Sequence, residues 1–446
     1  MSLDALDAYL YATHVARVTR GERLELEFTP DALDRWGFGS TVVSALLPLS
    51  AQVSSQQSTR ARVWLQGLLP EGRARTRMAE RAKVAPDDLL GFLGAYGRDT
   101  TGAVILVPAG ADPGREAHLP ELVDGERIGQ MLDEAAARGA ADQLTSIQGM
   151  EAKVVLTWTD RGFALPTPTH PSTHIVKLSR PTGSATSDLI DTECASLDLA
   201  RLVGLGHVDA HIADFAGRRA LVVRRYDRID VQDGAQRIHQ EDTAQALGLD
   251  TSDPTRKFQY GRQLPSLRAI AAVLDKVGAD PGGLLERTTF NLALGNTDAH
   301  AKNISVLHHP DGSAELAPAY DVAMHTHYEH AEPRFAMDVA GNRDMTSLTG
   351  RDLVTEASSW GLSAVRANRL VTQSLDKMDA ALADIDRAAH PGVSDLAWST
   401  VHRRVLALRA TTPAARPVRS ARPRRTDQPR GSKGTPTGGR FVREEP

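Results

Sequence analysis

Strand-like patterns dominate the first half of the chain. Residues Glu22–Phe28 alternate polar and apolar side chains, which is typical of a strand with one buried face. Apolar runs of strand length, rich in β-branched and aromatic residues, recur farther along the chain. They occupy Gly102–Pro108, Lys153–Trp158, His174–Leu178 and Ala220–Tyr226. We therefore expect a small mixed unit up to about residue 108 and a unit of short strands after it, separated by the Gly/Pro-rich connector at 109–114.

Helical patterns are sparse at first and then take over. Residues Arg73–Ala82 are predicted to form a basic helix. In Thr192–Val203 the apolar residues are three and four positions apart, and Gly204 provides a stop. From about 246 to 410 helical patterns dominate, and the predicted helix Gly283–Leu294 is followed by Gly295, a natural C-cap.

These patterns predict an α+β protein in four parts. Residues 1–108 form an N-terminal subdomain, 109–245 a strand-rich N-lobe, 246–410 a C-lobe and 411–446 a tail. The C-lobe is expected to be all-helical apart from the region 298–321, with a cleft between the two lobes. The tail is rich in Pro, Gly and Arg and almost free of apolar residues, so we expect it to be disordered. Its role stays open between a solubilising tail and a weak electrostatic arm for nucleic acid.

Composition narrows the class of protein. The 446 residues are 41% apolar and 24% charged, as in ordinary globular domains, and the net charge of -4 gives no general attraction to nucleic acid. The single cysteine, Cys194, excludes an internal disulfide and fits a reducing compartment. The N-terminus lacks a signal-peptide profile, and no apolar stretch approaches 18 residues. We expect a soluble cytoplasmic protein that does not contact a membrane.

The segment Asp298-Ala-His-Ala-Lys-Asn303 carries the most specific chemical signal. A strand, a turn and a returning strand are predicted between 304 and 317, and Asp321 follows them. The hairpin brings the chain back to the loop, so Asp298, Asn303 and Asp321 can converge on one site. Eukaryotic-type kinases arrange a catalytic base and two magnesium ligands in this order. Asp and Asn are also common turn residues, but this reading does not explain a third polar residue beyond the hairpin.

The residue types suggest a role for each member of the loop. Asp298 would hydrogen-bond the substrate hydroxyl and accept its proton late. Lys302 would offset charge on the γ-phosphate, and Asn303 and Asp321 would hold Mg²⁺, which prefers hard oxygen ligands. His300 is interpreted as a structural hydrogen-bonding residue within the loop rather than as a reacting group.

A kinase also needs a cation for the α- and β-phosphates and a partner that orients it. Lys177 shares a strand face with Ile175, and a lysine on a buried face requires an anion. Glu193, at the start of the next helix, is the candidate partner, although an acid there also suits the helix dipole. The segment 145–153 could cover the phosphates, but it contains one glycine only. No GxxxxGK[ST] or GxGxxG segment occurs, which argues against P-loop and Rossmann proteins.

Several segments together resemble the HipA family of serine/threonine kinases, the toxins of type II toxin–antitoxin modules. They follow the family order and cover roughly residues 60 to 325. The matching segments are Leu69-Pro-Glu-Gly72, Gly97-Arg-Asp-Thr-Thr-Gly-Ala103, Ser146-Ile-Gln-Gly149, Thr173-His-Ile-Val-Lys177, Arg225-Tyr-Asp-Arg228, His239-Gln-Glu-Asp242, Gly295–Asn303 and Pro318-Ala-Tyr-Asp321.

The resemblance implies a bilobal protein-kinase-like fold with an extra N-terminal subdomain, and the use of ATP and Mg²⁺. It also implies a HipB-like helix-turn-helix antitoxin as partner, and an aminoacyl-tRNA synthetase as the substrate whose phosphorylation arrests translation. Lys153 and Lys177 would contact the nucleotide, and Gln240 and Glu241 would lie near the hinge that holds adenine. Ser146 matches the serine whose autophosphorylation disables ATP binding in the family, which fits repulsion between a phosphoserine and the ATP phosphates.

The chain departs from the family in one place, where Met150-Glu-Ala152 precedes Lys153. Two other classes of function were weighed against a kinase toxin. One is a non-catalytic pseudokinase that acts as co-repressor in an antitoxin–DNA complex. The intact Asp298, Asn303 and Asp321 weigh against it. The other is a metal-dependent hydrolase using Asp298, His300 and Asp321, which leaves Lys177 and Lys302 unexplained.

Overall fold

The computed structural model describes residues 3–51, 54–114, 119–138, 152–181, 183–231 and 234–414. The described residues up to Pro413 form one compact unit. The predictions for Ser146, for the segment 145–151 and for the basic tail beyond 414 lie outside the described residues. Thr411, placed at the start of the tail by the sequence, is instead the last residue of a long helix, α12.

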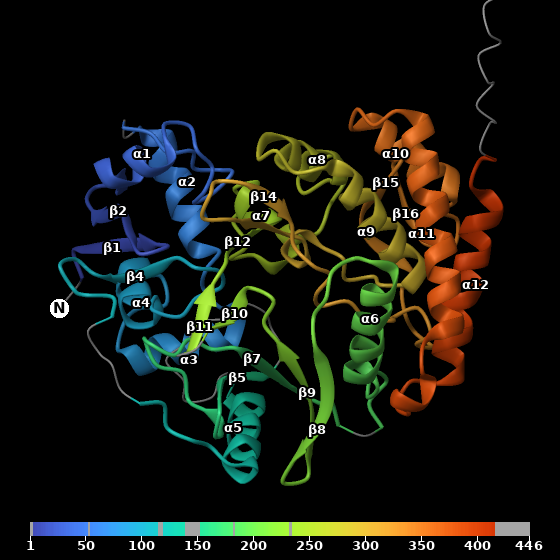
Figure 1. Ribbon diagram of the computed structural model, residues 1–446, viewed down its shortest axis with the longest axis horizontal. Helices are drawn as coiled ribbons and strands as arrows, with labels where there is room; N and C mark the ends of the chain where they lie inside the picture. The colour runs from blue at the N-terminus through green and yellow to red at the C-terminus, as the bar shows by residue number, and fades with distance from the viewer. Residues whose placement is uncertain are drawn as a thin grey trace, which may run out of the picture. The chain divides into compact units, whose positions relative to one another are not determined.

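An antiparallel sheet with strand order β3-β2-β1-β4 forms the centre of the N-terminal subdomain, residues 3–108 (Figure 1). Its strands are β1 (Ala5–Leu10), β2 (Thr13–Arg20), β3 (Leu24–Phe28) and β4 (Ile105–Pro108). Its helices are α1 (Pro30–Trp36), α2 (Ser55–Gln66), α3 (Gly72–Ala82) and α4 (Leu89–Tyr96).

The first two strands of this sheet were not predicted. Strand β1 does not alternate, because Asp7 is buried among apolar neighbours. Its carboxylate is satisfied by Arg17 on β2, 2.8 Å away, which makes the burial of an acid tolerable. This compensation comes from another strand and is therefore invisible in the local pattern.

The small lobe, residues 119–224, is built on a five-stranded sheet of order β6-β5-β7-β9-β8. Its elements are α5 (Gly125–Arg138), β5 (Lys153–Thr159), β6 (Gly162–Ala164), β7 (His174–Leu178), α6 (Leu189–Val203), β8 (Ala210–Phe215) and β9 (Arg218–Arg224). One face of this sheet packs Val154, Val176 and Val222 against α5. Figure 1 shows the helix and the strands of this lobe. Because side chains alternate along a strand, Lys153 and Lys177 point to the opposite face.

The large lobe, residues 239–414, is mostly helical but also contains strands. Its elements are β12 (His239–Asp242), α7 (Thr243–Ala246), α8 (Leu267–Lys276), α9 (Pro281–Leu294), β13 (Ser305–His308), β14 (Ala314–Leu316), β15 (Arg334–Val339), β16 (Asn342–Asp344), α10 (Gly350–Ser359), α11 (Ala364–Asp384) and α12 (Asp395–Thr411). The β13–β14 hairpin is where the sequence predicts it, and β12 adds to it. The expectation of an otherwise all-helical lobe is wrong for β15 and β16, which pair with each other.

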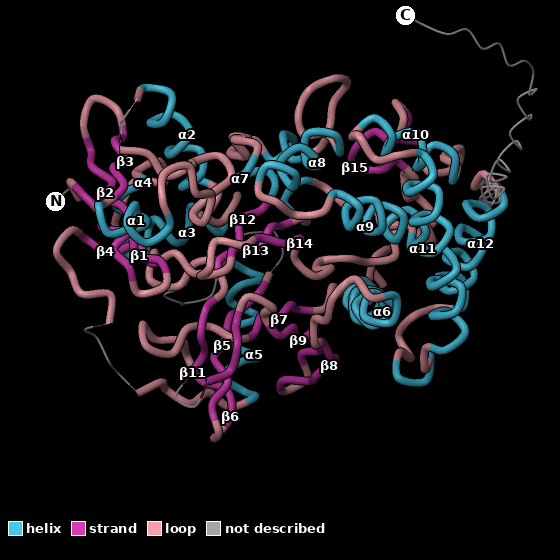
Figure 2. Tube along the Cα trace, turned by 45° about the horizontal axis from the view of Figure 1, so that its top comes forward, coloured by secondary structure: helices cyan, strands magenta, loops and turns pink. Residues whose placement is uncertain are grey.

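Helix α9 lies at the centre of the large lobe, where it packs against α11, α12 and α8 (Figure 2). Nearly every residue from Leu284 to Leu294 is buried, polar ones included, so the apolar stripe expected of a surface helix is blurred. Helix α6 of the small lobe contributes to the same apolar core and contacts α11. The small-lobe sheet ends at Arg224 and β12 already belongs to the large lobe, so the lobes meet within 225–238 rather than at 245. The hairpin of β10 (Arg228–Val231) and β11 (Gly234–Arg237) lies in this connection.

Candidate active site

A cavity of about 620 Å³ lies among the three parts of the compact unit. The N-terminal subdomain contributes Glu71 to its wall, the small lobe Lys153 and Lys177, and the large lobe Asp298 and Asp321, among other residues. All the candidate residues described by the structure line this cavity except Glu241. A pocket of this size, with charged groups converging in it, suits a small-molecule ligand.

The catalytic-type loop is shaped by its own backbone contacts. Helix α9 ends at Gly295 in the left-handed conformation, as the sequence predicts. The Asn296 side chain accepts a hydrogen bond from the Asp298 amide at 3.0 Å, and the Asn303 side chain donates to the Asp298 carbonyl at 2.9 Å. A 3₁₀ turn, Ala301–Asn303, then leads into β13. These bonds hold Asp298 and Asn303 on the same side of the loop, against the cavity.

The hairpin returns the chain to the loop, and Asp321 lines the same cavity as Asp298 and Asn303. Asp321 has a φ of 52°, a left-handed conformation that Asp tolerates better than most residues. Burial raises the pKa of its carboxyl, but the charge and hydrogen bond of Lys177, together with Lys153, outweigh burial and hold the pKa well below its usual range. Asp321 is therefore an anion at neutral pH.

Lys177 lies between two carboxylates. Its Nζ is 2.7 Å from Glu193 Oε1 on α6 and 2.5 Å from Asp321 Oδ1. The pairing with Glu193 is the one that the sequence suggested, whereas the contact with Asp321 could not be seen from the chain order. Lys153 is directly opposite Lys177 in the β5–β7 register, so two lysines face the cavity side by side. Such a pair can bind phosphate oxygens as point charges.

Strand β12 presents alternate residues to opposite sides. Gln240 and Asp242 line the cavity. Glu241 points away, where its carboxylate accepts hydrogen bonds from the Ser44 hydroxyl at 2.7 Å and the Ala45 amide at 2.6 Å. Gln240 and Glu241 were both expected near the hinge that holds adenine, but of the two side chains only that of Gln240 lines the cavity. The burial of Glu241 anchors the N-terminal subdomain to the large lobe.

The connection between the lobes supplies residues whose position at the cavity was not recognised in the sequence. Arg225, Tyr226 and Asp227 follow β9 directly and line the cavity beside Gln240. The Tyr226 hydroxyl donates to the Gln240 side-chain oxygen, and the Gln240 amide donates to Asp227 Oδ2 at 3.3 Å. This stretch therefore links the two lobes and forms one wall of the cavity.

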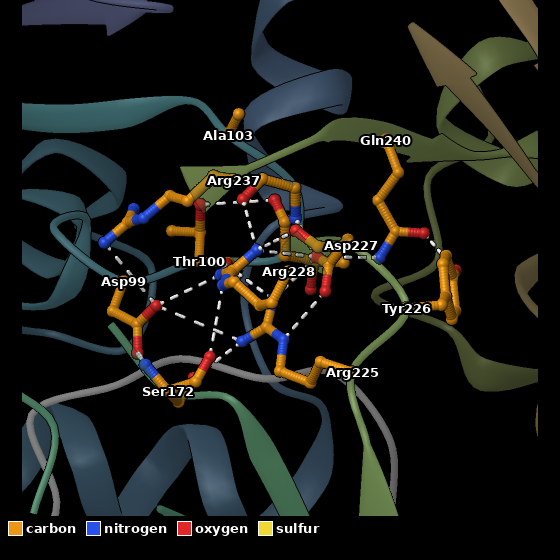
Figure 3. A network of polar contacts seen from close by, with 12 residues as sticks. Asp99, Thr100, Ala103, Ser172, Arg225, Tyr226, Asp227, Arg228, Arg237 and Gln240 are labelled. Atoms are coloured by element: carbon orange, nitrogen blue, oxygen red, sulfur yellow. Dashed lines mark hydrogen bonds and ion pairs between the residues drawn. The ribbon is translucent and has the colours of Figure 1, made fainter. Parts of the chain in front are cut away.

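Behind this connection lies a buried network of two acids and three arginines, Asp99, Asp227, Arg225, Arg228 and Arg237 (Figure 3). The Asp227 carboxylate forms ion pairs with Arg225 at 2.7 Å and with Arg228 at 3.0 Å. It also accepts a hydrogen bond from the backbone amide of Gly102 at 2.8 Å. Asp99 is 3.2 Å from Arg228 and 3.7 Å from Arg237. Burial raises the pKa of the Asp227 carboxyl, but Arg225 and Arg228 lower it by more, and the three arginines act in the same way on Asp99. Both acids therefore stay ionised. The network thereby joins the N-terminal subdomain to the lobe connection.

The contacts of Lys302 differ from those expected of a lysine that offsets charge on the γ-phosphate. Its Nζ is 2.7 Å from Glu71 Oε1 and 4.0 Å from Asp242 Oδ2, and its side chain is buried. The ammonium is therefore neutralised by protein carboxylates instead of standing open for a γ-phosphate. Glu71 belongs to the Leu-Pro-Glu-Gly segment singled out in the sequence, but no chemical role could be given to it from local pattern.

His300 is buried, as expected of a structural residue, but its ring does not make the hydrogen bond within the loop that the sequence suggested: Nδ1 is buried without a hydrogen-bond partner among the described residues. The ring meets Phe258 edge-on, with 5.1 Å between centroids. Burial, assisted by the charge of Lys257, lowers the pKa of His300 to about 3. The ring is therefore neutral at physiological pH, and Nε2 lies 3.7 Å from Asp298 Oδ1, beyond a normal hydrogen bond.

The cavity offers oxygen ligands of the kind that Mg²⁺ takes. Among the described residues no group of three or more His, Cys, Asp or Glu side chains is placed to hold a metal. Nucleotide-dependent Mg²⁺ sites use one or two protein oxygens and complete their shell with phosphates and water. Asn303 and Asp321, both at the cavity wall, match that smaller protein contribution.

Asp242 makes stability depend on pH. Burial raises the pKa of its carboxyl to about 6, and the Lys302 charge and the Gln245 amide only partly offset this. The folded-state pKa of Asp242 lies above the unfolded value of about 3.9. The contribution of this residue to stability is therefore fully present below about pH 3.9 and is lost as the pH rises through about 6. Asp242→Asn keeps a side chain suited to the N-cap of α7 and removes the charge. The gain in free energy of unfolding over the unmodified chain should be larger at pH 8 than at pH 4.5 by about 2 kcal/mol.

Urea denaturation of both proteins at the two pH values measures this difference. Asp253→Asn is the matched control, because Asp253 also caps a short helix but is exposed and has a lowered pKa. It should show no gain at pH 8. An equal effect of Asp242→Asn at both pH values would contradict the assignment of the raised pKa to this residue.

Comparison with known proteins identifies the family. Residues 6–107 match the model of the HipA N-terminal domain and residues 145–382 that of the HipA-like C-terminal domain. The chain is 28% identical over 388 residues to the serine/threonine-protein kinase toxin HipA of Shewanella oneidensis, covering 82% of this chain and 86% of that protein. It is 31% identical over 358 residues to the protein Y4mE of Sinorhizobium fredii, covering 77% and 82%. The chain belongs to the HipA family.

The fold agrees with this assignment. The solved complex of Shewanella oneidensis HipA, HipB and operator DNA contains a chain that superposes with a TM-score of 0.73, at 24% identity, over 91% of this chain and 96% of that one. The kinase-like α+β architecture expected from the sequence is therefore confirmed. Within the described residues, no helix has both the length and the apolar character needed to cross a bilayer.

Proposed function

We propose that this protein transfers the γ-phosphate of ATP to a serine or threonine hydroxyl of a protein, and that it acts as a toxin neutralised by an antitoxin. The observation that carries the proposal is the convergence of Asp298, Asn303 and Asp321 with the Lys177–Glu193 pair on one cavity. The kinase named among its relatives supports the use of ATP. The three acidic and amide side chains are separated in sequence, so their convergence is a property of the folded chain.

The side chains divide the work of phosphoryl transfer. Asp298 receives the substrate hydroxyl and takes up its proton late in the reaction. Lys177 and Lys153 neutralise the α- and β-phosphates, and Glu193 holds Lys177 in place. Asn303 and Asp321 would hold Mg²⁺, which supplies positive charge to the transferring phosphate oxygens.

Adenine is assigned to the wall formed by the lobe connection. Tyr226 and Gln240, which are hydrogen-bonded to each other, stand where the small-lobe sheet passes into the large lobe. Ile175 and Val223 add apolar surface from the sheet above them. Asp227 keeps Gln240 oriented, so the polar edge of the base meets a fixed donor and acceptor. Glu241 has no direct contact in this arrangement.

The identity of the substrate and partner rests on the family. The protein substrate is proposed to be an aminoacyl-tRNA synthetase, whose phosphorylation would arrest translation. The antitoxin is proposed to be a HipB-like helix-turn-helix protein, in line with the HipA–HipB–DNA complex of the related protein. Ser146 is proposed as a site of autophosphorylation that limits activity, since a phosphate there would repel the ATP phosphates.

Replacing Asp298 by asparagine tests the proposed reaction. Asn cannot accept the proton, so transfer of label from γ-labelled ATP to protein should fall by about 10²–10⁴-fold. Label in phosphoprotein and in free phosphate is measured after incubation with a cell extract and with purified aminoacyl-tRNA synthetases. Asp311→Asn is the control, because this exposed acid on the β13–β14 turn makes only local contacts to Ser313. Undiminished transfer by Asp298→Asn, or free phosphate without phosphoprotein in the unmodified chain, would contradict the proposal.

A further inference from the structure

Glu71, in the Leu69-Pro-Glu-Gly72 segment, stands at the beginning of helix α3, but its side chain does not cap the helix. Glu71 is the N-cap residue of α3, yet its side chain accepts no capping hydrogen bond. Its carboxylate enters the cavity instead, with Oε1 2.7 Å from Lys302 Nζ and Oε2 4.0 Å from Lys257 Nζ. The N-terminal subdomain thus reaches the loop that carries Asp298.

The ion pair of Glu71 and Lys302 is shielded from water. The Glu71 side chain is 10% exposed and that of Lys302 is 6% exposed. A charge pair with this burial is hardly screened, and removing one partner leaves the other in a medium that solvates it poorly. The pair therefore resists separation far more than a surface salt bridge does.

Lys302 is rigidly connected to the reacting groups. Its backbone carbonyl accepts a hydrogen bond from the Tyr320 hydroxyl at 2.7 Å, and Asn303 follows it in the same 3₁₀ turn. The Asn303 side chain in turn donates to the Asp298 carbonyl at 2.9 Å. Lys302 thus lies in the same turn as Asn303, which is hydrogen-bonded to Asp298.

From this geometry, and resting on the proposed function, we infer that Glu71 is a positioning residue for phosphoryl transfer. Through Lys302 it holds the loop so that Asp298 and Asn303 face the substrate and the phosphates. In this role Lys302 is the anchor of the loop rather than a ligand of the γ-phosphate. The N-terminal subdomain is then a working part of the active site and not only an attachment to the kinase body.

The inference is tested with Glu71→Gln, Lys302→Met and the double variant in the full chain. Misplacement of the loop lowers the rate of the chemical step and leaves the nucleotide pocket intact. Each of the three variants should lower kcat by about 10–100-fold, with the dissociation constant for ATP within about twofold of the unmodified chain. Because both residues act as one unit, the double variant should lose no more than either single variant.

Glu80→Gln is the matched control, since Glu80 is on the same helix but exposed and pairs only loosely with Arg77, at 3.5 Å. It should keep the unmodified kcat. If Glu71→Gln proves unfolded by circular dichroism, Glu71→Asp takes its place, because it keeps the charge but shortens the reach. That variant should lower kcat at least about threefold with an unchanged melting temperature.

Three results would overturn the inference while the proposed function stands. They are an unmodified kcat in the Glu71 variants, a loss in Lys302→Met more than tenfold greater than in Glu71→Gln, and a weakened ATP affinity at unmodified kcat. The second result would return Lys302 to the γ-phosphate. Failure of the unmodified chain to transfer phosphate would instead reject the proposed function, so the two failures are distinguishable.

Discussion

Asp321→Asn is expected to lower kcat/KM for phosphoryl transfer by about 10³-fold and to abolish the response of nucleotide binding to Mg²⁺. Asn tolerates the left-handed backbone of this position, where φ is 52°, so the fold should be retained. The substitution removes the charge that pairs with Lys177 and that would hold the metal. Losing one such electrostatic group in a preorganised site typically costs about 10²–10³-fold in rate, and the loss of metal affinity adds to it.

Glu193→Gln separates the two roles of Asp321. Glu193 also contacts Lys177, at 2.7 Å, but is not assigned to the metal. The Glu193→Gln substitution should weaken ATP binding and leave the Mg²⁺ concentration for half-maximal activity unchanged. Initial rates over a range of Mg²⁺ concentrations measure both variants. Identical Mg²⁺ dependence of Asp321→Asn and the unmodified chain would argue against the metal role of Asp321.

Asp227→Asn is expected to be strongly destabilising, with a loss of about 3–5 kcal/mol in the free energy of unfolding. The substitution leaves three buried arginines facing one remaining carboxylate, Asp99. The uncompensated charge is poorly solvated, since Arg225 and Arg228 are each only 4% exposed. The pKa of Asp227 is lowered in the folded state, so its stabilisation is present above about pH 4 and is lost as pH falls.

Urea denaturation at pH 7.5 measures this effect, with Asp133→Asn as the control. Asp133 makes an ion pair of similar length with Arg218, at 2.6 Å, but both side chains are exposed. The control should lose less than about 1 kcal/mol, and 1 M salt should reduce that loss but not the loss in Asp227→Asn. Equal losses in the two variants would show that the buried network does not couple the N-terminal subdomain to the lobe connection.

Local signals carried the prediction of the catalytic loop. Gly295 ends α9 because its backbone conformation suits glycine, and the turn at 310–313 needs only nearby residues. The β13–β14 hairpin lies between the loop and Asp321 in the sequence. Because a hairpin reverses the chain, the order of these elements was enough to predict that Asp321 returns to the loop. The strand positions of Lys153 and Lys177 were also predicted, since they are set by alternation within a few residues.

Long-range pairings were beyond such signals. Strand β1 contains a buried acid that is made tolerable by a neighbouring strand, and β15–β16 is a short hairpin packed on helices. The sequence contained a motif at 225–228 but did not indicate that 225–227 would line the cavity. Alternation along β12 could have assigned Gln240 and Asp242 to one face and Glu241 to the other, but which face met the cavity depended on where the N-terminal subdomain docks.

The sequence by itself determined the order of the reacting groups, the elements that carry them and the family, because these depend on residue identity and short spacing. Only the tertiary structure decided which charges meet. Glu71 and Lys302 are separated by most of the chain, and the Asp227 network joins three segments. Charge pairs gain their strength from burial, and burial is a property of the packed chain rather than of any local stretch. That is why the partners of Lys302 became visible only when the subdomains were assembled.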